Sequence, residues 1–98
     1  MAIVLDTSTN GGSTTGTSLT FSHTCTGSNL ILFVHTATDT ADNTDYVTGV
    51  TYNSVAMSVV DAFRSPGLGG SKMWMLVAPA TGANNVVITL NASKPIYG

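Results

Sequence analysis

The sequence predicts an all-β fold: an antiparallel β-sandwich, jelly-roll or immunoglobulin-like, with about seven strands in a single domain over residues 1–98. The first observation is composition, with sixteen threonines, no glutamate, and charged residues at only 8% of the chain. β-Branched threonine favours strands, whereas Glu, Lys and Arg are the usual residues of helix surfaces. The second observation is a series of short apolar segments separated by Gly, Asn and Ser, a spacing typical of a sandwich.

The longest apolar run is the predicted centre of this sandwich. It lies within Ser28–Ala37, where five apolar residues, LILFV, follow one another as Leu30–Val34. A continuous run of branched and aromatic residues is typical of a strand that is buried on both faces. We therefore expect Leu30–Val34 to lie in the middle of the core, covered from both sides.

The segments before this run have weaker strand signals. Ala2–Leu5 is predicted as a short first strand, and Thr7–Thr17, which is rich in Gly, Ser and Thr, as a loop. Ser18–Thr24 alternates strictly, with Leu19 and Phe21 on one face and hydroxyl residues on the other. That alternation predicts a half-buried strand.

Four further strands are expected after the central one. Asn53-Ser54 between two apolar segments predicts a two-residue hairpin turn. Arg64–Ser71 contains a proline and three glycines and is expected to be a mobile connection. The predicted strands are Val47–Tyr52, Val55–Ala62, Lys72–Ala78 and Asn85–Asn91.

Charge and cysteine content exclude several classes of protein. A formal net charge of −2 provides no basic patch, so nucleic acid is not an expected partner. No run approaches the ~20 apolar residues of a membrane span, and MAIVLD lacks the basic start of a signal peptide. We therefore expect synthesis in the cytoplasm and no membrane association. Cys25, the single cysteine, cannot form an intrachain disulfide and is expected to be a buried, inert thiol.

A weak metal site is the first candidate for chemistry. Asp39, Asp42, Asn43 and Asp45 fall within seven residues of one acidic loop, and calcium prefers clustered oxygen ligands. The loop lacks the glycine and the bidentate glutamate of an EF-hand, so we favour a solvated loop without calcium and expect no cofactor.

Two histidines offer a second possibility. His23 and His35 lie on strands that we expect to be neighbours, but zinc would need a third ligand and no close candidate exists. No arrangement of Ser, His and Asp has diagnostic spacing, so an enzyme is not expected.

Aromatic residues provide the remaining candidate site. Trp74 and Tyr46, together with Tyr52 and Tyr97, could form a platform on which a sugar ring stacks. Aromatic side chains in sandwiches more often fill cores and interfaces. Glycan binding is therefore the weaker of two functional hypotheses.

Three phrases of the sequence carry a resemblance to a family. DTSTNGGSTTGTSLTFSHTCTGSNLILFV, VTGVTYNSVAM and LVAPATGANNVVITL together resemble uncharacterised β-sandwich proteins of tailed phages, prophages and environmental bacteria. The resemblance implies a virion-associated or surface module, and it supplies no catalytic residues. It also implies that related domains continue with further strands beyond the position of Gly98.

These observations predict a non-enzymatic phage structural protein, located in the virion, that decorates a capsid or forms part of a head or tail fibre. The alternative is a carbohydrate-binding module on a virion or bacterial surface. We expect a homo-oligomer or contacts with other virion proteins, because Ala2–Leu5 and Val86–Leu90 look like edge strands without Lys, Arg or Pro. The tail Ala92–Gly98 contains Pro95 and is expected to lie outside the last strand.

Overall fold

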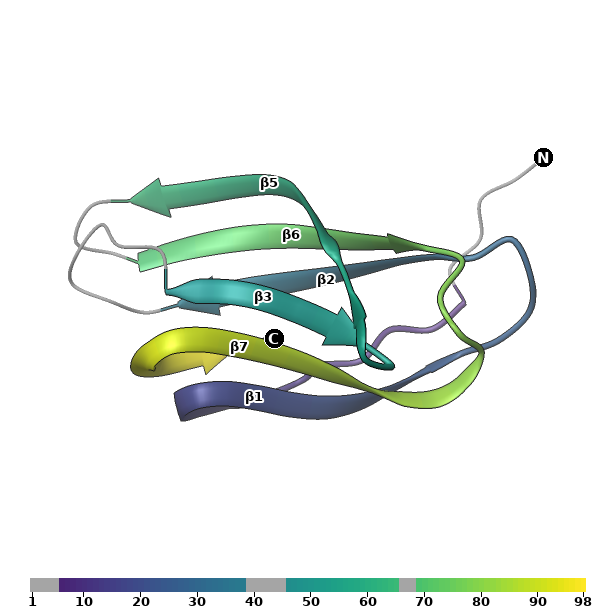
Figure 1. Ribbon diagram of the computed structural model, residues 1–98, viewed down its shortest axis with the longest axis horizontal. Helices are drawn as coiled ribbons and strands as arrows, with labels where there is room; N and C mark the ends of the chain where they lie inside the picture. The colour runs from purple at the N-terminus through teal and green to yellow at the C-terminus, as the bar shows by residue number, and fades with distance from the viewer. Residues whose placement is uncertain (1–5, 39–45, 66–68) are drawn as a thin grey trace.

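The structure, a computed structural model, describes residues 6–38, 46–65 and 69–98. In these residues every regular element is a strand, and all strand pairs are antiparallel, which confirms the predicted fold class (Figure 1). No helix in the described part of the chain could span a membrane. The seven strands are β1 (Ser13–Cys25), β2 (Ile31–Thr38), β3 (Val47–Tyr52), β4 (Val55–Ala56), β5 (Ser58–Ser65), β6 (Gly69–Val77) and β7 (Gly82–Tyr97).

The long strand β7 organises the sheet. Its first part pairs with β1 on one side and with β3 on the other, and its last residues pair with β1 and with the end of β2. The strand order is β4-β3-β7-β2-β6-β5, with β1 joined to β7 off this path. Val86–Leu90 therefore lies between two strands, and the expectation that it is a sheet edge is wrong.

The sheet curls into a nearly closed, barrel-like form. β4 pairs with β3, and after the single residue Met57 the chain continues as β5, which pairs with β6. Met57 is buried, and its N–H donates to the carbonyl of Val50, so this corner turns the chain from one side of the sheet to the other. The hairpin before the corner has the predicted turn, with positive φ at Asn53 and Ser54.

Several strand boundaries differ from the sequence prediction. The predicted strand Val55–Ala62 is interrupted at Met57, and β6 begins at Gly69, inside the predicted connection Arg64–Ser71. The largest differences are at β1 and β7. β1 begins at Ser13, inside the segment Thr7–Thr17 that we expected to be a loop. β7 runs through Pro95 to Tyr97 instead of ending near Asn91. Both extensions come from one contact, because the start of β1 pairs with the end of β7, with Thr15 opposite Pro95. The predicted strand Ala2–Leu5 lies outside the described residues.

The central strand β2 is only half buried. Its pattern alternates: Leu32, Val34 and Thr36 point inward, at 7%, 6% and 1% exposure. Ile31 and Phe33 are 48% and 52% exposed on the opposite face. In the strand order β2 lies between β7 and β6, but it pairs with β7 only at Ala37 and Thr38, so the predicted central run pairs with β6 alone. The prediction of burial on both sides is wrong, because no described element packs over the outer face.

The interior is filled by one apolar cluster with few polar groups. The indole N–H of Trp74 donates to Thr36 Oγ1 at 3.1 Å, and the hydroxyl of Tyr52 donates to the carbonyl of Ala80 at 2.9 Å. Every buried side-chain nitrogen or oxygen among the described residues has a partner. The buried apolar residues are Leu19, Cys25, Leu32, Val34, Val47, Val50, Tyr52, Met57, Trp74, Val86, Ile88, Leu90 and Ile96.

Candidate functional site

The outer face of β2 and β6 carries a row of apolar side chains. The register places Ile31 opposite Val77, Phe33 opposite Met75, and His35 opposite Met73. Directly paired residues of antiparallel strands share a face. The apolar face of β2 and β6, as we call it, therefore consists of Ile31, Phe33, His35, Met73, Met75 and Val77.

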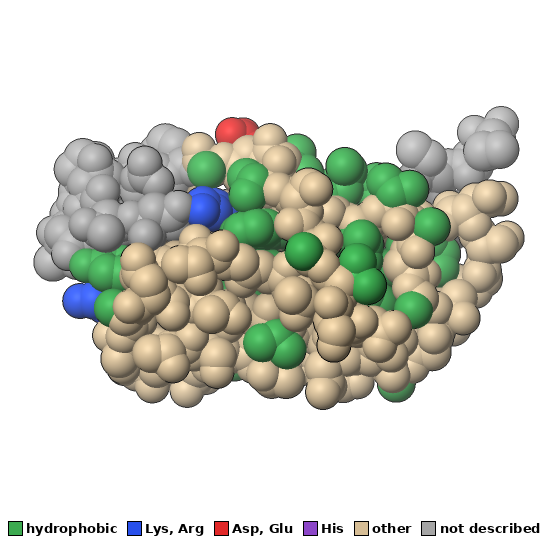
Figure 2. Space-filling model, viewed as in Figure 1, with side chains coloured by type: hydrophobic (Ala, Val, Ile, Leu, Met, Phe, Trp, Pro, Cys, Tyr) green, Lys and Arg blue, Asp and Glu red, His purple; other side chains and the backbone are tan. Residues whose placement is uncertain are grey.

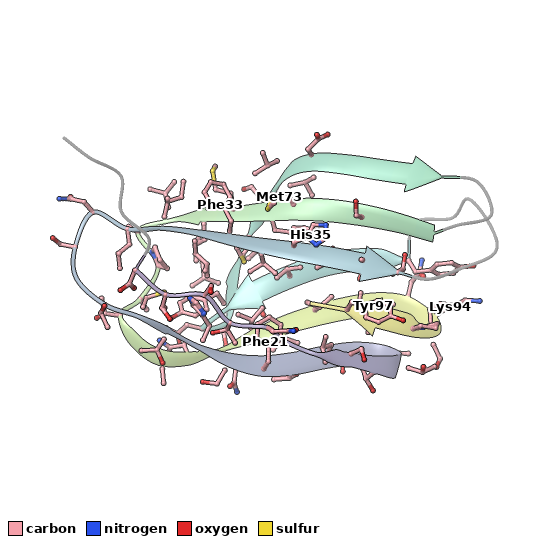
Figure 3. The ribbon with its side chains drawn as sticks, turned by 180° about the vertical axis from the view of Figure 1, so that it is seen from behind. Phe21, Phe33, His35, Met73, Lys94 and Tyr97 are labelled. Carbon is pink, nitrogen blue, oxygen red and sulfur yellow. The ribbon has the colours of Figure 1, made fainter. Side chains whose placement is uncertain are left out.

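This face is exposed, and it contains no Asp, Glu, Lys or Arg; its one ionisable residue is His35. Phe33 and Val77 are 52% and 66% exposed, while Met73 and Met75 are half-buried. Figure 3 shows Phe33, His35 and Met73 on neighbouring strands of the rear side. The third strand, β5, adds Ser58 opposite Met75, and Asp61 opposite Met73, at the border of the face. Large exposed apolar patches of this kind mark interaction surfaces.

The other side of the molecule gives a contrast. The outward residues of β1, which include Thr20, Ser22 and Thr24, are exposed and carry hydroxyl groups. Figure 2 shows the front of the molecule, where apolar side chains are interrupted by polar atoms and few charged side chains are visible. The polarity of the described surface thus comes mainly from hydroxyl and backbone groups.

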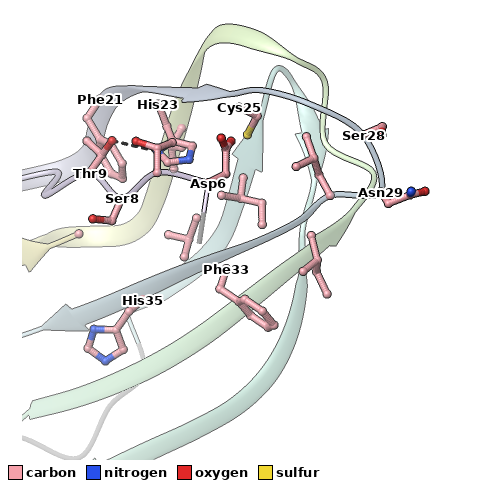
Figure 4. Close-up of a pocket in the computed structure, with 17 residues that line it drawn as sticks. Asp6, Ser8, Thr9, Phe21, His23, Cys25, Ser28, Asn29, Phe33 and His35 are labelled. Carbon is pink, nitrogen blue, oxygen red and sulfur yellow. Dashed lines mark hydrogen bonds between the residues drawn. The ribbon is translucent and has the colours of Figure 1, made fainter. Parts of the chain in front are cut away.

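A second feature is a groove between β1 and β2, which we call the seam groove (Figure 4). Among the described strands β1 pairs only with β7, and β2 pairs with β7 only at Ala37 and Thr38, so a gap is left between the two. The groove has a volume of about 910 Å³, with an apolar floor that includes Leu32, Val34 and Val86.

The N-terminal segment Asp6–Gly12 crosses the seam groove. At one end the backbone N–H and the hydroxyl of Thr26 both donate to the carboxylate of Asp6. These two hydrogen bonds lower the pKa of Asp6 from its ordinary value of 3.8, the hydroxyl contributing most. In the middle, Thr9 Oγ1 and His23 Nδ1 share a hydrogen bond of 2.9 Å.

The other end of this segment is fixed by backbone contacts with the end of β7. Gly11 N–H donates to the carbonyl of Gly98, and Gly98 N–H donates to the carbonyl of Gly12, both at 3.1 Å. A Cβ at Gly11 would overlap the Phe21 ring, so this position favours glycine. The segment is therefore held beside β1 and the end of the chain through a few anchored points and not through a strand ladder.

The polar groups of the groove have structural partners. His23 is buried and contacts the Tyr52 ring edge-on at 6.5 Å between centroids. Burial raises the pKa of Tyr52, with a further contribution from the Cys25 thiol. Cys25 is buried, as predicted. These contacts join the N-terminal segment, β1 and the core.

The two histidines do not form a site. Both line the seam groove, but His23 points inward from β1, whereas His35 is exposed on the outer side of β2. The two strands, which we expected to be neighbours, are not paired with each other. The described residues contain no group of three His, Cys, Asp or Glu side chains placed to hold a metal ion. The calcium candidates Asp39, Asp42, Asn43 and Asp45 all lie outside the described residues.

The aromatic platform also differs from expectation. Trp74 is 5% exposed, its N–H is bonded to Thr36, and the ammonium of Lys72 lies 5.2 Å from its ring centroid. Lys94 covers the half-buried ring of Tyr46 in the same way, at 4.9 Å. The position of Trp74 corrects its suggested role: its ring belongs to the core and offers no open face to a sugar.

The apolar face was not among the sites predicted from the sequence, although its signal was present. The run Leu30–Val34 is apolar at every position, and in a strand alternate positions point to opposite faces. Such a run makes both faces apolar, and only the structure tells which face the chain itself covers. Comparisons of this chain with protein-family models, curated proteins and solved structures found no match.

Proposed function

We propose that this chain is a non-enzymatic structural protein of a phage particle, a capsid decoration or a component of a head or tail fibre, that assembles through contacts between β-sheets. The observation that carries the proposal is the exposed apolar face of β2 and β6, centred on Phe33 and Met75. Burial of such a face against another protein is favourable by about 25 cal/mol per Å² of apolar surface.

Two further features support an assembling protein over an enzyme. His23 of the seam groove shares a hydrogen bond with Thr9 of the N-terminal segment, and the core residue Tyr52 donates to the carbonyl of Ala80, so both side chains have structural contacts. The chain has only eight charged residues, so its contacts with partners depend little on ion pairs. The phage context comes from the resemblance of its sequence phrases to phage and prophage proteins.

Light scattering at micromolar concentration tests the assembly. We expect a mass above the 10.1 kDa of one chain, changing little between low and high salt because few charge pairs are screened. A mass of 10.1 kDa at every concentration, together with no binding to purified phage particles, would contradict the proposal.

The position of the gene tests the phage context separately. We expect it among genes for capsid and tail proteins. A location among genes for sugar uptake or cell-wall metabolism would favour the carbohydrate-binding alternative instead.

A further inference from the structure

We propose that the apolar face of β2 and β6 packs against the same face of a second copy of this chain, forming a closed two-fold dimer. The inference rests on the proposed function and adds to it the partner and the surface. In such an isologous interface the same patch serves both copies.

Charge is the first reason to choose a second copy as the partner. None of the six residues of the face is Asp, Glu, Lys or Arg. A face placed against its own copy brings identical groups together, so any formal charge on it would be repeated across the interface. Asp61 lies at the border, on β5, where solvent can reach it. The face thus has no charge to attract an oppositely charged partner, and little to repel a copy of itself.

The arrangement of the residues is the second reason. Phe33 and Met75 form the central pair, flanked on one side by Ile31 with Val77 and on the other by His35 with Met73. The bulkiest side chain thus stands in the middle of the face, where interface residues contribute most to binding. The thioether of Met75 is flexible and can adapt to the ring of an opposing Phe33.

Size indicates the strength of the dimer. A strand rises about 3.3 Å per residue, and neighbouring strands lie about 4.8 Å apart. The eight residues of β2, together with β6 and β5 beside it, therefore cover roughly 26 Å by 14 Å. A standard interface buries about 800 Å² on each partner, roughly one seventh of the 5712 Å² surface of this chain. The footprint, about 360 Å², is less than half of this standard area, so the dimer is expected to be weak, with a dissociation constant in the micromolar range or above.

Cysteine cross-linking tests the orientation. Phe33→Cys places a thiol near the two-fold axis, where each copy meets its own residue in the partner. Mild oxidation should convert most of the protein into a disulfide-linked dimer. The unmodified chain, whose Cys25 is buried, and Ser22→Cys, on the exposed face of β1, should give only traces of dimer. Met75→Cys repeats the test at the other central position, should Phe33→Cys fold poorly.

The outcomes separate this inference from the proposed function. A cross-link at Val60→Cys on β5, with none at Phe33→Cys or Met75→Cys, would show association through the sheet edge and overturn the face-to-face dimer while leaving assembly intact. A protein that light scattering finds associated, but that none of these positions cross-links, would also overturn it. A monomer by light scattering would overturn the dimer, and it would overturn the proposed function as well only if the chain also failed to bind purified phage particles.

Discussion

The inner and outer faces of β2 place similar residues in opposite surroundings. Leu32 and Val34 point into the curled sheet and are nearly buried, below the seam groove. Ile31 and Phe33 stand on the outer face with about half of their surface exposed. The two faces are almost equally apolar, so side-chain chemistry alone does not distinguish the core from an interface. What distinguishes them is whether the rest of the chain supplies a cover.

The largest expected effect is on the inner face. Leu32→Asp would bury a carboxylate without a partner among the apolar residues of the core, costing several kcal/mol and abolishing folding. Circular dichroism during heating is the measurement. A soluble variant with an unchanged melting temperature would show that β2 is not part of the core.

The same change one residue further along should have a different result. Phe33→Asp places the carboxylate on the exposed outer face, so the chain should fold with a melting temperature close to that of the unmodified monomer. Its self-association should weaken at least tenfold, because the two-fold axis brings the two new charges together. Gel filtration over a concentration series measures this.

Two controls sharpen the Phe33 comparison. Phe33→Thr removes the ring without adding charge and keeps a residue that favours strands. It should also weaken the dimer. Ser22→Asp adds the same charge on the opposite side of the molecule and should leave association unchanged. Equal losses in Phe33→Asp and Ser22→Asp would indicate a general charge effect and not a specific face.

A smaller effect is expected for the polar contact behind the apolar face. Thr36→Val preserves shape but leaves the buried indole N–H of Trp74 without its acceptor, which costs about 1–3 kcal/mol. Thr36→Ser keeps the hydroxyl and should recover most of the hydrogen-bond contribution. Urea titration measures both variants. Equal stability of Thr36→Val and the unmodified chain would mean that the contact does not stabilise the fold.

The smallest effect concerns the N-terminal segment and depends on pH. The pKa of Asp6 is lowered in the folded chain by hydrogen bonds from Thr26, so below its ordinary value of 3.8 the unfolded chain binds the proton more readily. This contribution to stability is complete above that pH and is lost as the pH falls through the lower folded pKa. Asp6→Asn should reduce the loss of stability on acidification over this range. An unchanged acid dependence of the melting temperature would contradict the assignment.

Much of the fold could be predicted from local patterns. The alternation in Ser18–Thr24 and the Asn53-Ser54 turn have local causes, in the two-residue period of a strand and in residues that tolerate positive φ. The ends of β1 and β7 could not be predicted, because they depend on a pairing between Ser13 and Tyr97 at opposite ends of the chain. A proline such as Pro95 normally signals the end of a strand, and here that distant pairing overrides it.

For the candidate site, too, some features follow from the local sequence and others depend on distant parts of the chain. The continuous apolar run predicted a strand buried on both faces, but only the inner face, with Leu32 and Val34, is buried. It could not show that the outer face lacks cover from the chain itself, because that depends on where distant segments pack. The role suggested for Trp74 was wrong for a related reason. An aromatic residue in an alternating strand can point either way, and the register with β2 places this one inside with Val34.

Sedimentation equilibrium of the unmodified chain tests the central claim most directly, since it measures mass without a probe or a substitution. We predict that the mass rises from 10.1 kDa at low concentration to a plateau at twice that value, with half-dissociation in the micromolar range or above. A mass that stays at 10.1 kDa throughout would contradict the claim that the outer face of β2 and β6 is covered by a second copy. A mass that keeps rising without a plateau would contradict a closed dimer.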